Sequence, residues 1–400
     1  MRGNNRADER GEPWRMDSKL TVGAVVTRRT NTKWIYDNAS TIYRRLKPHQ
    51  RVNHFVNTHE LTRKDLVIKN IKRKARQLEK EGKYEDARAM LEITPPTYVL
   101  PADYALFLEE FKRRPGSVWI AKPIGKAQGK GIFLLKNLKQ VQEWNVFRVR
   151  QETEGGLPGP EAYIVQEYIT NPHLLGGKKY DIRLYCLITS FSPLCVWLHR
   201  SGFARFSKHR FSLQNLEDSF VHLTNHAIQK LDVDYNATET DCKWPLSSLR
   251  KYLRQTVGEE NTLRCFQKIE ETVVHTMLSV KSVMISDPHC FELYGFDVLI
   301  DDNLQPWLVE VNASPSMTSD TDTDAAMKSR ILHDTFDVLG LDGGRHPDDL
   351  SVGGFDLLYK ADQILTEKKR EGGNQTAQRL RLKQGAVYNS TLGLPLPLVR

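Results

Sequence analysis

The stretch FDVLIDDNLQPWLVEVN, residues 296–312, constrains the fold more than any other part of the chain. Two runs of β-prone residues flank the polar residues 301–303, so a tight hairpin is expected. Pairing around that turn places Asp297 roughly opposite Glu310, and Asn312 projects from the same strand face as Glu310. Three oxygen ligands on an otherwise apolar hairpin fit Mg²⁺, which proteins commonly share with nucleotide phosphates. The competing interpretation is a surface hairpin whose acidic side chains only face water.

A second stretch, WIAKPIGKAQGKGIFLL at residues 119–135, is typical of two strands joined by a glycine-containing loop. Lys122 ends the first strand and can bind phosphate as a point charge. Glycines 125, 129 and 131 let the backbone approach phosphate oxygens closely. The loop does not match the GxxxxGK[ST] pattern of a P-loop. Alone, such a loop is more often a plain hairpin connection, so the argument for phosphate depends on the neighbouring metal hairpin.

The segment VQEYI, residues 165–169, is a candidate for the edge that binds adenine. Gln166 and Glu167 supply polar side chains, and the backbone around Tyr168 and Ile169 supplies further hydrogen-bonding groups. The alternative is an ordinary central strand, which is the better interpretation without the other motifs.

Three charged residues alternate along the strand-like segment GGKKYDIRLY. Lys179, Asp181 and Arg183 therefore project from one strand face. Burying them without partners would be costly, and a phosphate–metal cluster supplies such partners. A salt-bridged sheet surface is the alternative.

Strands cluster along the chain instead of alternating strictly with helices, which predicts an α+β fold with an antiparallel or mixed sheet. A chain of 400 residues usually divides into subdomains. Prolines 95, 96 and 101 indicate an extended linker. Helical spacing is found at 104–113, 246–283 and 324–339. The expected parts are a polar tail (1–30), an N-terminal subdomain with a basic helix (31–95), a central subdomain (96–165), a C-terminal subdomain with the metal site (166–340) and a flexible basic tail (341–400).

The formal net charge of +9 and pI of about 9.1 indicate an anionic partner, such as nucleic acid, a membrane surface or an acidic protein. The helix expected at 61–80 holds eight Lys/Arg against two acidic residues. It is either a solvated basic helix or a track for an acidic polypeptide. No sequence signature of an RNA- or DNA-binding fold is present, which argues against nucleic acid.

The five cysteines are widely spaced and form no CxxC pair, so neither a disulfide framework nor a zinc site is expected. No apolar run reaches the length of a membrane span, and the charged first residues lack the apolar region of a secretory signal. These features predict an intracellular protein that does not enter a membrane.

Taken together, the motifs closely resemble the tubulin tyrosine ligase-like family, an ATP-grasp family, over roughly residues 52–340. The segments that carry the resemblance are WIAKP, AQGKGIFL, IVQEYI, GGKKYDIRLY, GFARFS, HLTNHAIQK, HCFELYGFDVLID and PWLVEVNASPS. The segment NHFVNTHELTRKDLVIKNIKR is similar to the smaller members of the tubulin polyglutamylase branch. Residues 1–45 depart from the family's N-terminal region.

The resemblance implies roles for residues that match the family's motifs. Positions matching the ATP contacts are Lys122, Gln128, Gly129, Gln166, Glu167, Tyr168, Ile169, Lys179, Tyr180 and Asp181, with Thr224 and Asn225 near the nucleotide and the incoming amino acid. Arg205 and Lys243 match positions that hold the substrate glutamate, Arg183 is a phosphate partner, and Asp297, Glu310 and Asn312 match the magnesium ligands.

The activity implied is an ATP- and Mg²⁺-dependent ligation of free L-glutamate to glutamate side chains in the acidic tails of tubulin. ATP converts the acceptor carboxylate to an acylphosphate, which the amine of glutamate attacks. The resemblance also implies a cytoplasmic, cytoskeletal location at the axoneme or basal body of a cilium or flagellum, and leaves open a need for accessory subunits. Two alternatives remain, namely addition of glycine or another amino acid, and a catalytically silent microtubule-binding protein.

Overall fold

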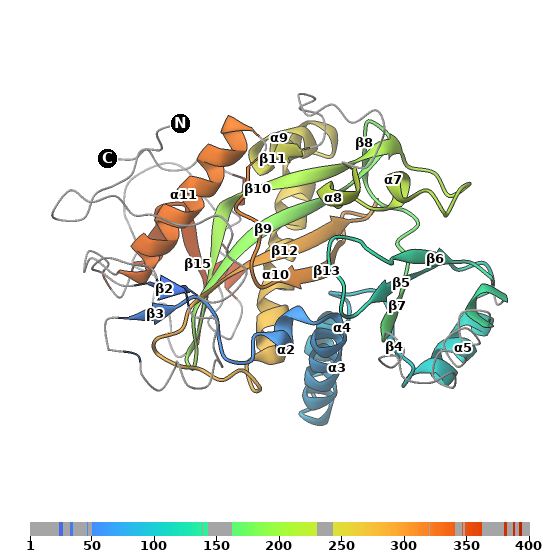
Figure 1. Ribbon diagram of the computed structural model, residues 1–400, viewed down its shortest axis with the longest axis horizontal. Coiled ribbons are helices and arrows are strands. Elements are labelled where there is room, and N and C mark those ends of the chain that lie inside the picture. Colours follow the sequence, from blue (N-terminus) through green and yellow to red (C-terminus); the bar gives the residue numbers. More distant parts are fainter. Residues whose placement is uncertain are drawn as a thin grey trace.

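The computed structural model describes residues 24–26, 33–34, 46, 50–137, 139–142, 162–229, 243–319, 321–340, 346, 349–361, 380–381, 387–388 and 392–393. The expected α+β fold is confirmed, with two principal antiparallel sheets and helices packed against them (Figure 1). The polar tail expected at 1–30 lies outside the described residues apart from β1 (Ala24–Val26), which pairs with β2 (Lys33–Trp34) and β3 (Arg51–Val52).

The larger sheet has eight strands, and its main path runs β13-β12-β9-β10-β15-β14. Its strands are β8 (Leu174–Leu175), β9 (Lys178–Phe191), β10 (Leu194–Arg210), β11 (Lys243–Pro245), β12 (Glu292–Ile300), β13 (Pro306–Asn312), β14 (Ser351–Val352) and β15 (Phe355–Lys360). The segments PLCVWLHR and GFARFS form the single long strand β10, with bulges in its pairing to β9. The bulges turn the strand without ending it.

Helices cover both faces of this sheet (Figure 1). On one face, α9 (Leu246–Thr256) and α10 (Glu259–Val280) pack on alternate residues of β9 such as Ile182 and Leu184. On the other, α11 (Asp322–Leu339) packs on Tyr185, Leu187 and Phe203. The helical segment expected at 246–283 is thus two helices, which break at Gly258, where φ is +85°.

A short helix α2 (His59–Thr62) leads into α3 (Lys64–Lys80) and α4 (Tyr84–Leu91), and α3 packs against α10. The predicted basic helix is therefore confirmed as α3. Ile68, Ile71, Ala75 and Leu78 are buried on its apolar face, as the spacing predicts.

The smaller sheet has the order β4-β7-β5-β6. It consists of β4 (Thr97–Leu100), β5 (Trp119–Pro123), β6 (Phe133–Leu135) and β7 (Tyr163–Glu167), with α5 (Tyr104–Arg113) packed on it. The expected linker at 95–101 is wrong, because residues 97–100 are strand β4 and pair with β7. The boundary expected between residues 165 and 166 falls inside β7.

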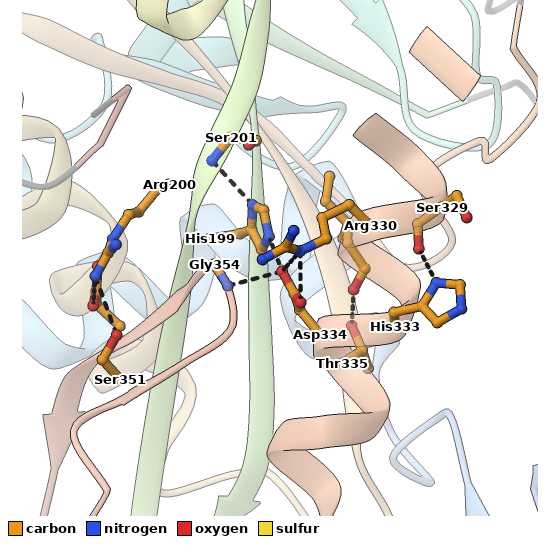
Figure 2. Close-up of polar contacts among 12 residues, drawn as sticks. His199, Arg200, Ser201, Ser329, Arg330, His333, Asp334, Thr335, Ser351 and Gly354 are labelled. Carbon is orange, nitrogen blue, oxygen red and sulfur yellow. Dashed lines mark hydrogen bonds and ion pairs between the residues drawn. The ribbon is translucent and has the colours of Figure 1, made fainter. Parts of the chain in front are cut away.

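The structure also differs from the flexible tail expected after residue 340. Strand β15 pairs with β10 inside the larger sheet, and its apolar side chains are buried. Figure 2 shows how this segment is held: His199 on β10 and the backbone N–H of Gly354 both contact Asp334 on α11, at 3.0 and 2.8 Å. Arg200 forms a bidentate ion pair with Asp356 at 2.6 and 2.7 Å. The buried side chains of Phe355, Leu357, Leu358 and Tyr359 thus complete a core, although polar residues surround this segment in the sequence.

The remaining described elements are α7 (Ser219–His222), α8 (His226–Gln229), β16 (Leu380–Arg381) and β17 (Val387–Tyr388). Cys186, Cys195, Cys265 and Cys290 are free thiols, as expected, while Cys242 lies outside the described residues. Among the helices that the structure describes, none is long and apolar enough to cross a membrane.

Candidate active site

The smaller sheet lies beside the larger one (Figure 1), and residues of both line a cleft of about 870 Å³ that is partly open to solvent. Of the residues predicted to form the site, those that line the cleft are Lys122, Gln128, Gly129, Gln166, Glu167, Tyr168, Ile169, Lys179, Asp181, Arg205, Thr224, Asn225, Asp297 and Glu310. The structure therefore brings together residues from β5, β7, β9, β10, β12, β13 and three loops.

The hairpin of β12 and β13 forms as predicted. Asp297 pairs directly with Glu310 across the strands, and the Asn312 amide lies 3.4 Å from a carboxylate oxygen of each. The turn is closed by Asp301, whose carboxylate accepts the backbone N–H groups of Asn303 and Gln305 at 2.9 Å. Two carboxylates that line the cleft, with one amide beside them, are a donor set that suits a hard cation such as Mg²⁺.

Asp297 is almost fully buried and is held by two arginines. Arg183 donates to it bidentately at 2.5 and 2.9 Å, and Arg205 approaches at 2.7 Å. Burial alone would raise the pKa of Asp297, but the two guanidinium groups outweigh it and hold that pKa below its usual value. The carboxylate is therefore ionised at neutral pH.

Arg205 also pairs with Asp181, its cross-strand neighbour on β9, through both carboxylate oxygens. The alternation predicted for Lys179, Asp181 and Arg183 is confirmed, and all three are buried. The charged groups of Asp181, Arg183, Arg205 and Asp297 thus neutralise one another beneath the cleft, which offsets the free-energy cost of burying them.

Lys122 lies at the back of the cleft and is 6% exposed. Its ammonium donates to Gln166 at 2.8 Å, and Gln166 in turn donates to the hydroxyl of Thr97 at 2.9 Å. Burial lowers the pKa of Lys122 to about 8. A phosphate beside this ammonium would restore its charge and gain a buried ion pair.

Lys179 lies nearby on β9 and donates to the Tyr168 hydroxyl at 3.0 Å and to the His222 carbonyl at 2.9 Å. The Tyr168 hydroxyl also hydrogen-bonds His222 Nδ1 at 2.9 Å. Burial, strengthened by the charge of Lys122, lowers the pKa of Lys179 to about 7. Tyr168 therefore holds a cation with its side chain, a role that the sequence did not reveal.

The glycine-containing loop bends over the cleft onto the HLTN segment. Gln128 and Gly129 have φ values of +62° and +78°, and a Cβ on Gly129 would lie 2.3 Å from Ile228 Cδ1 and 3.2 Å from Asn225 Oδ1. Only glycine fits there, so the loop backbone and Asn225 face the same part of the cleft.

Four of the predicted residues do not line the cleft, namely Tyr180, Arg183, Lys243 and Asn312. Tyr180 lies on the opposite face of β9, buried in the core with its hydroxyl 2.9 Å from His173 Nδ1, so its side chain does not reach the cleft. Strand alternation turns this side chain into the core, and the cofactor-binding role predicted for Tyr180 stays a prediction. Glu167 is held by Arg114 at 2.8 Å. Lys243 on β11 pairs with Arg205 in register but lies outside the cleft lining, 3.3 Å from Asp324.

Sequence reasoning missed Lys64, the first residue of α3. Its ammonium lies 3.7 Å from Glu310 and donates to the Lys126 carbonyl at 3.1 Å, so it joins the metal hairpin to the glycine-containing loop. The one sign of Lys64 in the sequence was its position within the basic helix expected at 61–80.

The sequence model of the tubulin-tyrosine ligase family matches residues 43–346, about three quarters of the chain. The chain belongs to this family. Relatives within it include "Probable tubulin polyglutamylase TTLL9" of Bos taurus, which is 40% identical over 86% of this chain and 78% of its own length. "Probable tubulin polyglutamylase ttll-9" of Caenorhabditis elegans is 45% identical over 78% of this chain and 73% of its own. "Probable alpha-tubulin polyglutamylase Ttll1" of Tetrahymena thermophila is 40% identical over 85% and 84%.

Membership of the tubulin-tyrosine ligase family confirms the resemblance inferred from the motifs. The matched region contains every predicted site residue, from Lys122 to Asn312, and the whole of helix α3. The comparison therefore covers both the cleft and the basic helix beside it.

Proposed function

We propose that the chain is an ATP- and Mg²⁺-dependent ligase that adds glutamate to glutamate side chains in the acidic tails of tubulin. The observation that carries the proposal is the cleft, where Asp297 and Glu310 face the buried cations Lys122 and Lys179. The names of the relatives supply the substrate class, since several are called probable tubulin polyglutamylases.

Lys122 and Lys179 are the groups suited to the phosphates of ATP, because both are buried cations with a lowered pKa. The loop at Gly129 offers backbone N–H groups, and the segment 166–169 borders the part of the cleft assigned to adenine. Asp297, Glu310 and Asn312 would hold Mg²⁺, which when bound offsets phosphate charge and orients the transferred group.

The protein's part in the reaction is positioning and charge. A tubulin carboxylate does not react with an amine until it becomes an acylphosphate, and phosphoryl transfer depends mainly on cations placed around the transferred oxygens. Lys122 and Lys179 are so placed, and Arg183 keeps Asp297 ionised and oriented. No protein nucleophile is required.

The incoming glutamate is assigned to the side of the site formed by Arg205, Thr224 and Lys243, opposite the part assigned to ATP. Arg205 and Lys243 are direct cross-strand neighbours, so both project from one sheet face. Cations at this point suit the carboxylates of a free amino acid.

The acceptor tail is assigned to α3. Lys69, Arg73, Arg76 and Lys80 are exposed and recur every three or four residues, which places them on one helix face, named here the basic stripe. Helix α3 begins at Lys64 beside Glu310, so an acidic polypeptide along the stripe leads to the cleft. Such a substrate places the enzyme at microtubules, including those of cilia.

The test is incorporation of labelled amino acids into microtubules by the purified chain with ATP and Mg²⁺. Glutamate transfer that requires both cofactors is the expected result. Glycine transfer without glutamate transfer would support the glycylase alternative instead. Absence of transfer, together with no rise in melting temperature on adding ATP and Mg²⁺, would support a silent microtubule-binding protein.

A further inference from the structure

His222 is a buried histidine beside the cleft to which the proposed reaction assigns no role. It is the last residue of α7 and is 3% exposed. Both of its ring nitrogens have partners. Nε2 lies 2.9 Å from the carbonyl oxygen of Asn215, and Nδ1 lies 2.9 Å from the Tyr168 hydroxyl.

The Asn215 carbonyl decides which nitrogen of His222 carries the proton. A carbonyl oxygen can only accept, so Nε2 is protonated and donates to it. Burial lowers the pKa of His222, so the ring is neutral at physiological pH and Nδ1 is an acceptor. The Tyr168 hydroxyl therefore donates to Nδ1, and it keeps this proton because burial raises the pKa of Tyr168.

The oxygen of Tyr168 is thereby left to accept from Lys179. Lys179 Nζ donates to this oxygen at 3.0 Å and lies 4.5 Å from the centroid of the same ring. Hydrogen bonds in series polarise one another, so a hydroxyl that donates becomes a better acceptor. We name Lys179, Tyr168, His222 and Asn215 the histidine network, in which each residue donates to the next.

His222 determines the orientation of the Lys179 ammonium twice. Its backbone carbonyl accepts one N–H of Lys179 at 2.9 Å, and its ring fixes the hydroxyl that accepts a second. The third N–H has no acceptor among the residues that the structure describes, and Lys179 lines the cleft. Because an ammonium has three N–H donors, fixing two of them leaves one oriented donor for an anion in the cleft.

We propose that His222 is a positioning residue for the nucleotide, which acts through Tyr168 to hold the Lys179 ammonium in the orientation that receives a phosphate oxygen. The inference rests on the proposed function, because Lys179 is assigned there to the phosphates of ATP. It adds a side chain that acts on the lysine and has no direct contact with the ligand.

A purely structural role for His222 is the competing explanation. The bond from Nε2 to Asn215 ties the preceding loop to α7, and the ring packs edge-on against Phe211 with centroids 6.0 Å apart. Such a role needs Nε2 and the ring. The use of Nδ1 to hold the hydroxyl that accepts from Lys179 is the feature that it leaves unexplained.

The charged groups around the histidine network define a readout based on pH. Burial has the largest effect in lowering the pKa of Lys179, Lys122 on β5 lowers it further, and Asp181 on β9 raises it. Asp218, in the loop before α7, is the acidic group beside His222. An ammonium that loses an acceptor has a still lower pKa, so its affinity for an anion begins to fall at a lower pH.

Two amide variants separate the roles of the two ring nitrogens. His222→Asn ends near the position of Nδ1, so it keeps an acceptor for Tyr168 and loses the bond to Asn215. His222→Gln reaches the position of Nε2, so it keeps the bond to Asn215 and loses the acceptor for Tyr168. A positioning role therefore requires His222→Asn to be the better nucleotide binder, and a structural role requires the opposite.

The test is calorimetry of the full chain with the Mg²⁺ complex of a non-hydrolysable ATP analogue, from about pH 6 to about pH 9. His222→Gln is expected to weaken binding about tenfold, the effect of one weakened charge-assisted contact, and to lose affinity at a lower pH than wild type. His222→Asn is expected to bind within about threefold of wild type and to keep its pH dependence.

Tyr168→Phe removes a single oxygen atom and provides a second, independent measurement. It is expected to weaken binding and to shift the pH dependence in the same direction as His222→Gln. Because both changes break the same series of hydrogen bonds, the double variant should bind no more weakly than Tyr168→Phe alone.

Thermal unfolding without nucleotide is the control for folding, and Tyr168→Phe decides the matter where a His222 variant does not fold. The inference is overturned if His222→Asn is as defective as His222→Gln or more so, if His222→Gln or Tyr168→Phe retains wild-type affinity and pH dependence, or if the losses of the single variants add in the double variant. The expected pattern of nucleotide binding without glutamate transfer to tubulin would reject the proposed function and leave this inference intact.

Discussion

The buried lysines set the chemistry of the site at the scale of single residues. Lys122 and Lys179 lie in the cleft with a lowered pKa of about 8 and about 7, and burial is the main cause of both shifts. An ammonium so placed loses its proton easily until an anion arrives. Nucleotide phosphates would supply that anion, so nucleotide binding and protonation should be coupled.

The coupling predicts a definite pH dependence. Phosphate binding favours the protonated lysines, so the affinity for Mg²⁺–ATP should fall as pH rises from about 7 to about 9, by no more than about tenfold per pH unit for each lysine. Calorimetry in buffers of different ionisation enthalpy should show proton uptake at about pH 8. Affinity and proton balance that do not vary over this range would contradict the assignment of both lysines.

The lowered pKa values of Lys122 and Lys179 also affect the stability of the nucleotide-free protein. This stability should increase with pH, whereas the affinity for Mg²⁺–ATP should decrease. The unfolded chain keeps these lysines protonated up to their ordinary pKa of 10.5, so it binds more protons than the folded chain above about pH 7. Their contribution to the free energy of unfolding is therefore least favourable below about pH 7 and improves as pH rises toward 10.5.

Among the structural elements, the loop between β5 and β6 depends most on one residue. Gly129 combines a φ of +78° with a close approach to Ile228, whereas Gly125, in the same loop, has neither a positive φ nor any atom within 4 Å of an added Cβ. Gly129 and Gly125 can therefore serve as a test position and its control, because only Gly129 has a constrained backbone and a close neighbour.

Gly129→Ala is expected to displace the loop from Asn225 and to weaken Mg²⁺–ATP binding about tenfold or more, since strain of about 1–3 kcal/mol must be relieved by local movement. Gly125→Ala should bind as wild type does. Nucleotide affinity measured for both variants decides the matter, and equal affinities would show that the loop does not contact the nucleotide.

Strand β15 is a second element whose role follows from its contacts. Asp334 accepts hydrogen bonds from Arg330 at 3.0 Å and from Gly354 at 2.8 Å, and pairs with the buried His199. Burial would raise the pKa of Asp334, but these partners together lower it, so the carboxylate is ionised and fixes the strand to α11.

Asp334→Ala should lower the free energy of unfolding by about 3 kcal/mol, because it leaves buried donors without an acceptor. His333→Ala removes an exposed neighbour that hydrogen-bonds only the Ser329 carbonyl among the described residues, and should change stability by about 0.5 kcal/mol or less. Denaturant unfolding of the two variants measures the difference. A similar stability for both would mean that Asp334 does not anchor β15.

The correct and the wrong predictions differ in how far apart along the sequence the interacting residues lie. The hairpin at 296–312 was predictable because strand alternation and the turn fix Asp297, Glu310 and Asn312 locally. Strands β4 and β15 were not, since proline-rich and polar surroundings hide short segments whose pairing partners lie far along the chain. Lys64 likewise reaches Glu310 only through the tertiary packing of α3.

At the scale of the whole molecule, the basic stripe and the cleft form one path for an acidic polypeptide. Helix α3 begins at Lys64, beside Glu310, and Lys69, Arg73, Arg76 and Lys80 lie along it with no ion pair among the described residues. The net charge of +9 adds a general attraction to anionic surfaces.

Charge reversal along the stripe, Lys69→Glu with Arg76→Glu, should raise the KM for microtubules about tenfold or more and reduce its dependence on salt, while leaving the affinity for Mg²⁺–ATP unchanged. Lys112→Glu with Lys251→Glu, exposed changes on α5 and α9 that alter the net charge equally, is the control. Initial rates at several salt concentrations provide the measurement. Equal effects of the stripe and control variants would place the tail elsewhere.

The central claim is that the Asp297–Glu310–Asn312 corner supports ATP-dependent ligation of glutamate to tubulin side chains. Mass spectrometry of tubulin tails, after incubation with the chain, ATP, Mg²⁺ and glutamate, tests it most directly. Wild-type protein should add glutamate to glutamate side chains only when ATP is present, and Glu310→Gln should add none while keeping its melting temperature. Addition without ATP, addition by Glu310→Gln at the wild-type rate, or no addition by the wild-type protein would contradict the account.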